Sequence, residues 1–470
     1  MRKSVLGVGV FLAAGLGQAA EPVRDVTSSA TDREAVAVTV YNDDLALVKE
    51  RRRVDLPSGL TRLSLRDVTA QMRPETALLR AVSGQPLSLI EQNFDFDLLT
   101  PQKLLEKYVG REVTVIRSHP TTGEERREKA TVLAAGSGTV LRFADRIETG
   151  VPGRLAFDSV PSNLRDRPTL SVVLEAPGGK RPLELSYLTG GLSWQADYVA
   201  NLSADGARLD LDAWVTLTNR SGTSFEQATL QLVAGTVNRV AAPRPEMAVD
   251  VMSMAGRAKV RGPTEESLMD YHLYSFERPT GIADNQTKQL ALLSATAVPV
   301  RRQYLLAGNA GYYGGRIDQG TQKLKPAVFI EFDNKGGQLG KPLPAGVVRV
   351  YARDRHGAAQ FVGEDRIGHT AKNEMLKLQL GEAFDITAER KQTSFRRIAD
   401  NVTESAWRIE LRNVREEAVV VRVEEPMPGD WEMLRESHPH AKDTARLAAW
   451  SVSVPAGGKA VLEYAVRVRW

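Results

Sequence analysis

The clearest hydrophobic pattern lies between Leu183 and Asn219, where apolar and polar residues alternate in three successive segments. The apolar positions are Leu183/Leu185/Tyr187, then Trp194/Ala196/Tyr198/Ala200/Leu202, then Leu209/Leu211/Ala213/Val215/Leu217. A period of two is typical of strands with one buried and one solvated face. Gly190-Gly191 and Asp205-Gly206 separate the segments, so the pattern predicts an antiparallel meander.

The same alternation recurs towards both ends of the chain. Near the N-terminus, residues 35–56 read as a strand, a turn and a second strand. Near the C-terminus, alternating runs begin at Trp407, Val419, Trp450 and Leu462, and Pro455-Ala456-Gly457-Gly458 is expected to form a hairpin loop. These runs predict an immunoglobulin-like sandwich. The segments WRIELRN and WVTLTN each end a strand on Asn, which indicates either a duplicated sandwich or the common use of Asn at turns.

One short helix is expected over Thr100 to Gly110. Thr100 is a good N-cap, Pro101 suits the first helical position, and Gly110 is typical of a helix end. Four β runs follow, over residues 112–117, 129–134, 139–143 and 154–157. By analogy, a helix followed by short strands predicts a small SH3-like or Sm-like barrel.

Together these patterns predict a mainly β, multi-domain protein made of antiparallel β-sandwiches, the small barrel and one short helix. A chain of 470 residues is too long for one hydrophobic core. The expected parts are a signal peptide (1–19), a flexible lead-in (20–34), an N-terminal β module (35–98), the helix-plus-barrel module (99–160), a central β-sandwich (161–385) with a mobile insert at 241–265, and the C-terminal sandwich (386–470).

The first 19 residues have the three parts of a secretory signal: Arg2-Lys3, an apolar run from Val5 to Leu16, and small residues before Ala20. The apolar run is too short for a spanning helix, which needs about 20 residues, and no later segment is long and apolar enough. We therefore expect a chain without a membrane span, cleaved before Ala20 and periplasmic or secreted.

Composition narrows the function classes further. The chain has no Cys, so disulfides, thiol catalysis and thiolate metal sites are excluded. Its formal net charge is +4, of which Arg2 and Lys3 in the leader contribute two charges. So small a charge gives no electrostatic reason to expect nucleic acid as a partner.

No established catalytic motif is present: there is no G-x-S-x-G, S-x-x-K, H-E-x-x-H, Walker loop or EF-hand calcium loop. We therefore predict no catalytic residues and no cofactor. A single segment of 16 residues gathers potential metal ligands, namely Asp354, His356, Glu364, Asp365 and His369. Either they surround a divalent metal, as in a metal-dependent envelope hydrolase, or they form the solvated rim of a hairpin.

The best recognition feature is the glycine-rich loop from Gly308 to Arg316. Adjacent Tyr312 and Tyr313, with Arg316, offer rigid contact area with polar tips, as binding surfaces commonly do. The alternative is a hairpin tip with one Tyr folded into the core. The leading hypothesis is an exported non-enzymatic protein that binds another envelope component, a protein or a glycan, through loops. The sequence carries no signal for an oligomeric state.

Several stretches together resemble one bacterial family. They are VYNDDLALVKE (40–50), EQNFDFDLLTPQKLLEKYVG (91–110), LSYLTGGLSWQADYVA (185–200), LVAGTVNRV (232–240), DYHLYSFERPTGIADNQTKQLALL (270–293) and LPAGVVRVYARDRHGAAQFVGEDRIGHT (343–370). The chain is similar to exported proteins that carry the domain of unknown function 4139, distant relatives of mucoidy-inhibitor-A-like proteins. This resemblance implies export and a β-rich architecture, but no activity that could be assigned to a residue.

Overall fold

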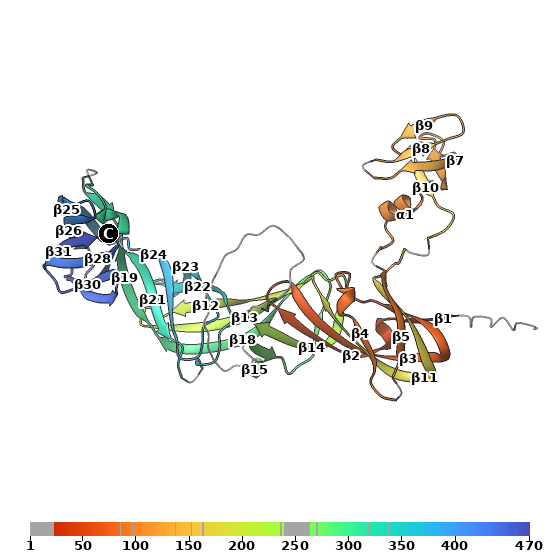
Figure 1. The fold of residues 1–470 in the computed structure, drawn as a ribbon, viewed down its shortest axis with the longest axis horizontal. Coiled ribbons are helices and arrows are strands. Elements are labelled where there is room, and N and C mark those ends of the chain that lie inside the picture. The colour runs from red at the N-terminus through yellow and green to blue at the C-terminus, as the bar shows by residue number, and fades with distance from the viewer. Residues whose placement is uncertain are drawn as a thin grey trace, which may run out of the picture.

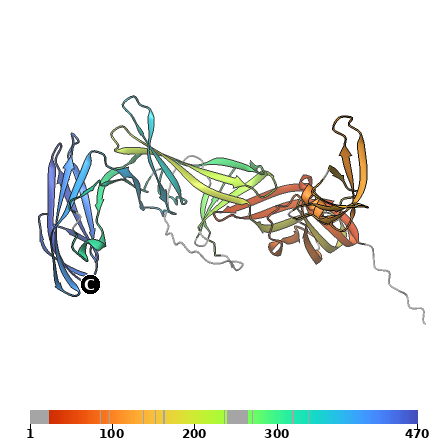
Figure 2. The ribbon, with the colours of Figure 1, turned by 90° about the horizontal axis from the view of Figure 1, so that it is seen from above.

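The computed structural model describes residues 23–470 except 85, 96, 137, 152, 162–163, 236, 239–263, 269–270, 318–319 and 337. The described residues form a long molecule of five sheets, one α-helix and three short 3-10 helices. The N-terminal strands lie at one end, the C-terminal strands lie at the other, and a sheet from the middle of the chain lies between them (Figure 1 and Figure 2). The fold is mainly β and has several parts, which confirms the predicted fold class.

Two long strands, β3 (Leu45–Arg66) and β11 (Thr169–Thr189), organise the N-terminal sheet and pair antiparallel along almost their whole length. Apolar side chains at alternate positions of β3, such as Val48 in its first half and Leu63 in its second, are buried. Shorter strands complete the sheet: β1 (Arg24–Ser28), β2 (Arg33–Tyr41), β4 (Leu78–Ala81), β5 (Ser88–Asp95), β14 (Phe225–Ala234), β15 (Thr264–Leu268), β16 (Tyr271–Ser275) and β17 (Thr280–Ile282). The 3-10 helices η1 (Ala30–Asp32) and η2 (Pro74–Thr76) lie in its connections.

The predicted helix is confirmed as α1 (Pro101–Lys107). The hydroxyl of Thr100 accepts the N–H of Lys103 over 3.1 Å, which caps the helix, and Leu105 and Tyr108 are buried against the next sheet. That sheet contains β6 (Glu112–Ser118), β7 (Glu125–Ala134), β8 (Val140–Arg142), β9 (Ile147–Thr149) and β10 (Arg154–Ala156). Each of the four predicted β runs overlaps one of these strands, β6, β7, β8 and β10 in turn, although β7 begins four residues before the predicted run, and β9 is additional.

The central sheet has the order β18-β13-β12-β22-β23. Its strands are β12 (Leu192–Leu202), β13 (Arg208–Asn219), β18 (Gln286–Pro299), β22 (Gly346–Arg353) and β23 (Ala359–Ile367). The apolar residues predicted to face inward on β12 and β13, including Trp194 and Tyr198, are buried. Glycine is needed at Gly346, because a Cβ there would lie 2.2 Å from the carbonyl oxygen of Ala196 on the adjacent strand.

Two sheets form the C-terminal sandwich, and its core contains Trp407, Trp450 and Tyr464. One sheet contains β19 (Arg301–Ala307), β21 (Ala327–Asp333), β24 (Met375–Glu382), β27 (Val419–Pro426), β29 (Ala441–Thr444) and β30 (Leu447–Val454). The other contains β20 (Gln322–Leu324), β25 (Ile386–Ala399), β26 (Val402–Asn413), β28 (Asp430–Glu436) and β31 (Lys459–Arg469). The short helix η3 (Ala310–Tyr313) follows β19.

The predicted meander is divided between two sheets. β11 pairs with β3, whereas β12 and β13 pair with each other in the central sheet. Gly191 therefore leads the chain into another sheet instead of closing a hairpin; its φ is 80°, and a Cβ there would lie 2.6 Å from the Cα of Ser221. The loop over residues 455–458 also connects two sheets, because β30 pairs with β27 and β31 pairs with β26. The predicted hairpin at Asp205-Gly206 is confirmed by the antiparallel pairing of β12 with β13. The hairpins predicted at Gly190-Gly191 and at residues 455–458 were wrong, because alternation reports burial and not the pairing partner.

The parts of the chain also differ from the predicted division. Residues 24–32, expected to be a flexible lead-in, form β1 and η1, and β1 pairs with β3. The N-terminal module is completed by β11, β14 and β16 from later in the chain, and the C-terminal sandwich includes β19, β20, β21 and β24, which precede residue 386. The signal peptide and residues 241–263 of the predicted insert lie outside the described residues, and Thr264 begins β15.

Within the described ranges, no helix has the length and apolar character that a membrane crossing requires.

Candidate functional site

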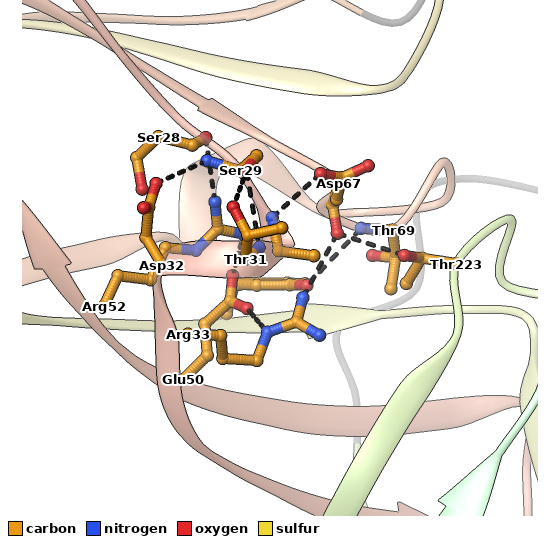
Figure 3. A network of polar contacts seen from close by, with 12 residues as sticks. Ser28, Ser29, Thr31, Asp32, Arg33, Glu50, Arg52, Asp67, Thr69 and Thr223 are labelled. Atoms are coloured by element: carbon orange, nitrogen blue, oxygen red, sulfur yellow. Dashed lines mark hydrogen bonds and ion pairs between the residues drawn. The ribbon is translucent and has the colours of Figure 1, made fainter.

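A buried ion-pair network joins β2 and β3 of the N-terminal sheet (Figure 3). Glu50 on β3 accepts from Arg33 Nε over 2.6 Å and from Arg52 Nη2 over 2.8 Å. Glu50 and Arg52 are each only 1% exposed. Buried charges are tolerated only when they are paired, so this network fixes β2 and β3 relative to each other.

Asp67 lies beside this network and accepts hydrogen bonds from three segments that are far apart in the chain. Its carboxylate accepts the N–H of Ala30 over 2.9 Å and a guanidinium N–H of Arg167 over 2.6 Å. Its carbonyl oxygen accepts the hydroxyl of Thr223 over 3.1 Å. Burial raises the pKa of Asp67, but the bonds from Ala30 and Arg167 outweigh this effect and hold the pKa below its usual value. Asp67 has a φ of 63°, so this junction keeps a residue in a conformation that L-residues rarely adopt.

A groove of about 800 Å³ lies beside this network. Its walls come from residues 30–31 and 33–36, from Asp67, Leu98 and Asp284, and from residues 166–168, 222–224 and 226–227. Most of these are loop residues on a sheet that the buried ion pairs hold rigid. The volume is within the range of about 300–1,000 Å³ that is typical of ligand sites.

The groove wall carries more carboxylates than guanidiniums. Arg33 and Arg167 are its cations, and each is already paired with a carboxylate, Glu50 and Asp67 respectively. Glu226 and Asp284 also line the groove, and no described cation forms an ion pair with either of them. The wall therefore has two carboxylates whose charge is available to a cationic ligand.

A β-bulge shapes the same wall. The register between β14 and β17 shifts between Phe225 and Ala228, and Gln227 within the shift has a φ of 50°. Glu226 and Gln227 are both exposed. Bulges redirect side chains and are frequent beside functional sites, so this bulge supports a role for the groove.

The predicted binding residues lie elsewhere, on the C-terminal sandwich. Tyr313 is 0% exposed, and its hydroxyl donates to Glu425 over 3.0 Å. Tyr312 is half-buried against Trp407, and Arg316 is exposed. Tyr313 is therefore a core residue and offers no contact surface, which corrects its assignment as an exposed anchor. The physical reason is that a buried carboxylate needs hydrogen-bond donors, and the Tyr313 hydroxyl supplies one.

The five potential metal ligands are not brought together. Asp354 accepts backbone N–H groups of its own turn, where His356 also lies, at the tip of the β22–β23 hairpin. Glu364 pairs with a guanidinium on β22, Asp365 accepts a backbone N–H of β24, and His369 follows the far end of β23. Among the described residues, no group of three or more His, Asp or Glu side chains could hold a metal. The hairpin separates these residues along its length, so the five side chains do not form one common set of ligands.

Comparison with known proteins places the chain in a family. A search of curated proteins finds no match. The family model described as a domain of unknown function, DUF4139, matches residues 183–470, more than half of the chain. The match includes the groove segment 222–227 and Asp284, but not Arg33, Glu50 or Asp67. By this match, the chain belongs to the family of proteins that carry the domain of unknown function DUF4139.

Proposed function

We propose that this chain is an exported, non-enzymatic protein of the cell envelope that binds a segment of a partner protein in the groove beside Asp67. The observation that carries the proposal is the groove itself, whose loops stand on strands fixed by the buried Arg33–Glu50–Arg52 network. Loops on a rigid β scaffold are the usual place for recognition.

The charges of the groove favour a basic partner segment. Glu226 and Asp284 supply carboxylates without described counter-ions, while Ala35, Val36 and Pro168 supply apolar wall. A Lys or Arg side chain with a long aliphatic stem would match both properties. Electrostatic complementarity of this kind adds specificity and speeds association.

The binding proposal is tested by affinity capture from envelope extracts with the tagged mature chain, followed by mass spectrometry. We expect the parent to enrich a partner that Glu226→Lys depletes by about tenfold, which corresponds to about 1.4 kcal/mol. The matched control is Glu416→Lys, an exposed charge reversal on the C-terminal sandwich. Equal capture by Glu226→Lys and Glu416→Lys, or no enrichment over the tag alone, would contradict the proposal.

Export is tested separately. We expect the mature chain to begin near Ala20 and to be released with the periplasmic fraction, because residues 1–19 have the three parts of a secretory signal. Intact-mass measurement after fractionation checks this expectation. Retention of Met1 in the accumulated protein would show that the segment is not processed.

A further inference from the structure

The outer face of the central sheet carries aromatic and polar side chains that the groove does not use. On β12 and β13 the alternate residues Ala196, Tyr198 and Val215 face the core. The opposite face exposes Trp214, which is 40% exposed, and Gln195. This face is therefore accessible to solvent, and it carries both aromatic and polar side chains.

A fixed polar centre occupies the middle of this face. Asp197 accepts from Arg349 Nη1 over 2.9 Å and from the Thr216 hydroxyl over 2.6 Å. The guanidinium of Arg349 also lies 3.3 Å from the carboxylate of Glu364. Both Arg349 and Glu364 keep a large exposed fraction, 39% and 53% of their side chains. Donors and acceptors are thus held in place while part of each group remains open to a ligand.

Aromatic rings flank the polar centre on both sides. Trp214 lies directly opposite Asp197 in the β12–β13 register. On the other side, Phe361 is 55% exposed and contacts Tyr351 edge to face, with ring centroids 5.7 Å apart. Trp214 and Phe361 are three strand spacings apart and about four residues offset along the strands, so they are separated by roughly 20 Å.

From this arrangement we propose that the outer face of the central sheet binds a neutral oligosaccharide. Sugar rings present C–H groups, which pack against the electron-rich face of an aromatic ring, and hydroxyl groups, which pair with carboxylates and guanidiniums. The charges at the centre, Asp197 and Glu364 around Arg349, are paired with each other, so the centre of the face offers no strong surplus of either sign. A distance of roughly 20 Å between the flanking rings suits a ligand of several sugar units.

A protein partner fits this face less well. An interface core is depleted of charged residues, whereas here a charged triad of Asp197, Arg349 and Glu364 separates the aromatic rings. Burying that triad under a protein would remove its water without supplying new partners for each group. The successive hydroxyl groups of an oligosaccharide can form hydrogen bonds to each charged group in place of the water that they displace.

The test is titration calorimetry of the full mature chain with chitotetraose, cellotetraose and maltotetraose. We expect at least one tetrasaccharide to bind with a dissociation constant below about 1 mM. Trp214→Ala and Arg349→Gln should each weaken this binding by tenfold or more. Trp470→Ala, which removes another half-exposed Trp from the far end of the molecule, should leave the binding unchanged.

Three outcomes would overturn the inference. One is the absence of binding heat for all three tetrasaccharides at about 10 mM with a folded parent protein. The second is equal weakening by Trp214→Ala and Trp470→Ala, which would indicate non-specific stacking. The third is that Trp214→Ala abolishes capture of an envelope protein and leaves any saccharide binding unchanged, which would make this face a protein interface. Since Glu226 does not lie on this face, Glu226→Lys should not affect the titration, so this result is independent of the groove.

Discussion

Asn219 and Asn413 make matching hydrogen bonds at the ends of two strands that lie in different sheets. Each amide nitrogen donates to the carbonyl oxygen four residues later, over 2.9 Å from Asn219 and 2.8 Å from Asn413. Each amide oxygen accepts the backbone N–H two residues later, over 3.0 Å in both cases. Each amide nitrogen also reaches a carbonyl just beyond a distant strand, after β17 and after β30. One buried side chain thus closes a tight loop and joins it to another strand.

We predict that Asn413→Ala lowers the free energy of unfolding by about 2–4 kcal/mol, since each buried polar group left without a partner costs about 1–3 kcal/mol. Urea denaturation measures the change. The control is Asn401→Ala, because Asn401 is exposed at the turn between β25 and β26. If both variants unfolded at the same urea concentration, the hydrogen bonds of Asn413 would make no net contribution to the free energy of unfolding.

Much of this local arrangement can be predicted from the sequence. WRIELRN and WVTLTN place Asn at matching positions at the end of an alternating strand, and that repeat indicates either a duplicated sandwich or the common use of Asn at turns. The structure gives the two Asn residues the same role, but β13 belongs to the central sheet and β26 to the C-terminal sandwich. Alternation predicts burial because it is a local property of a strand. Strand pairing depends on distant segments, so alternation predicts hairpins after Thr189 and Val454, whereas the strands on either side of each turn pair with other strands.

We predict that Trp194→Ala lowers the free energy of unfolding by roughly 3–5 kcal/mol, because the large indole would leave a cavity. Trp194 is 3% exposed and lies edge to face with Tyr274, with ring centroids 6.4 Å apart. Thermal unfolding measures the change, and Trp470→Ala is the control because Trp470 is 51% exposed. A melting temperature equal to that of the parent would show that the indole does not support the core.

The candidate groove was harder to predict than the core. The alternation of β3 places Glu50 and Arg52 on the same face as the buried Val48 and Val54, so the sequence contains a signal for a buried charge pair. Asp67 offers no such signal. Its partners come from three segments far apart in the chain, and only the folded chain brings them together.

We predict that Glu425→Ala lowers the free energy of unfolding by about 3–5 kcal/mol, because it leaves the guanidinium of Arg390 buried without its carboxylate. The two side chains are fully buried, and Arg390 Nη2 donates to Glu425 Oε1 over 2.6 Å. The double variant Arg390→Met with Glu425→Leu should be more stable than Glu425→Ala, since it removes both charges and fills the space. The Tyr313 and Tyr464 hydroxyls would remain paired over 3.0 Å. A double variant less stable than Glu425→Ala would show that the ion pair is not the reason for the loss.

The last prediction concerns acid sensitivity at His369. Its Nδ1 accepts the N–H of Ala345 over 3.1 Å, which requires a neutral ring with no proton on that nitrogen. Burial lowers the pKa of His369 below its usual 6.5, and His272 lowers it further, while Asp43 opposes the shift. The His369 ring is therefore harder to protonate in the folded state than in the unfolded state. This contribution to stability is complete above the unfolded pKa of about 6.5 and is lost as the pH falls through the folded pKa.

We therefore expect the free energy of unfolding of the parent to fall between about pH 7 and pH 5 more steeply than that of His369→Asn, whose amide oxygen can still accept a hydrogen bond but does not titrate. The control is His356→Asn, because His356 is exposed in the β22–β23 turn and its replacement should leave the parental slope unchanged. Urea denaturation at several pH values measures the three slopes. Equal slopes for the parent and His369→Asn would mean that the ring takes up its proton in the folded state as readily as in the unfolded state, and that the hydrogen bond from Ala345 does not hold it neutral.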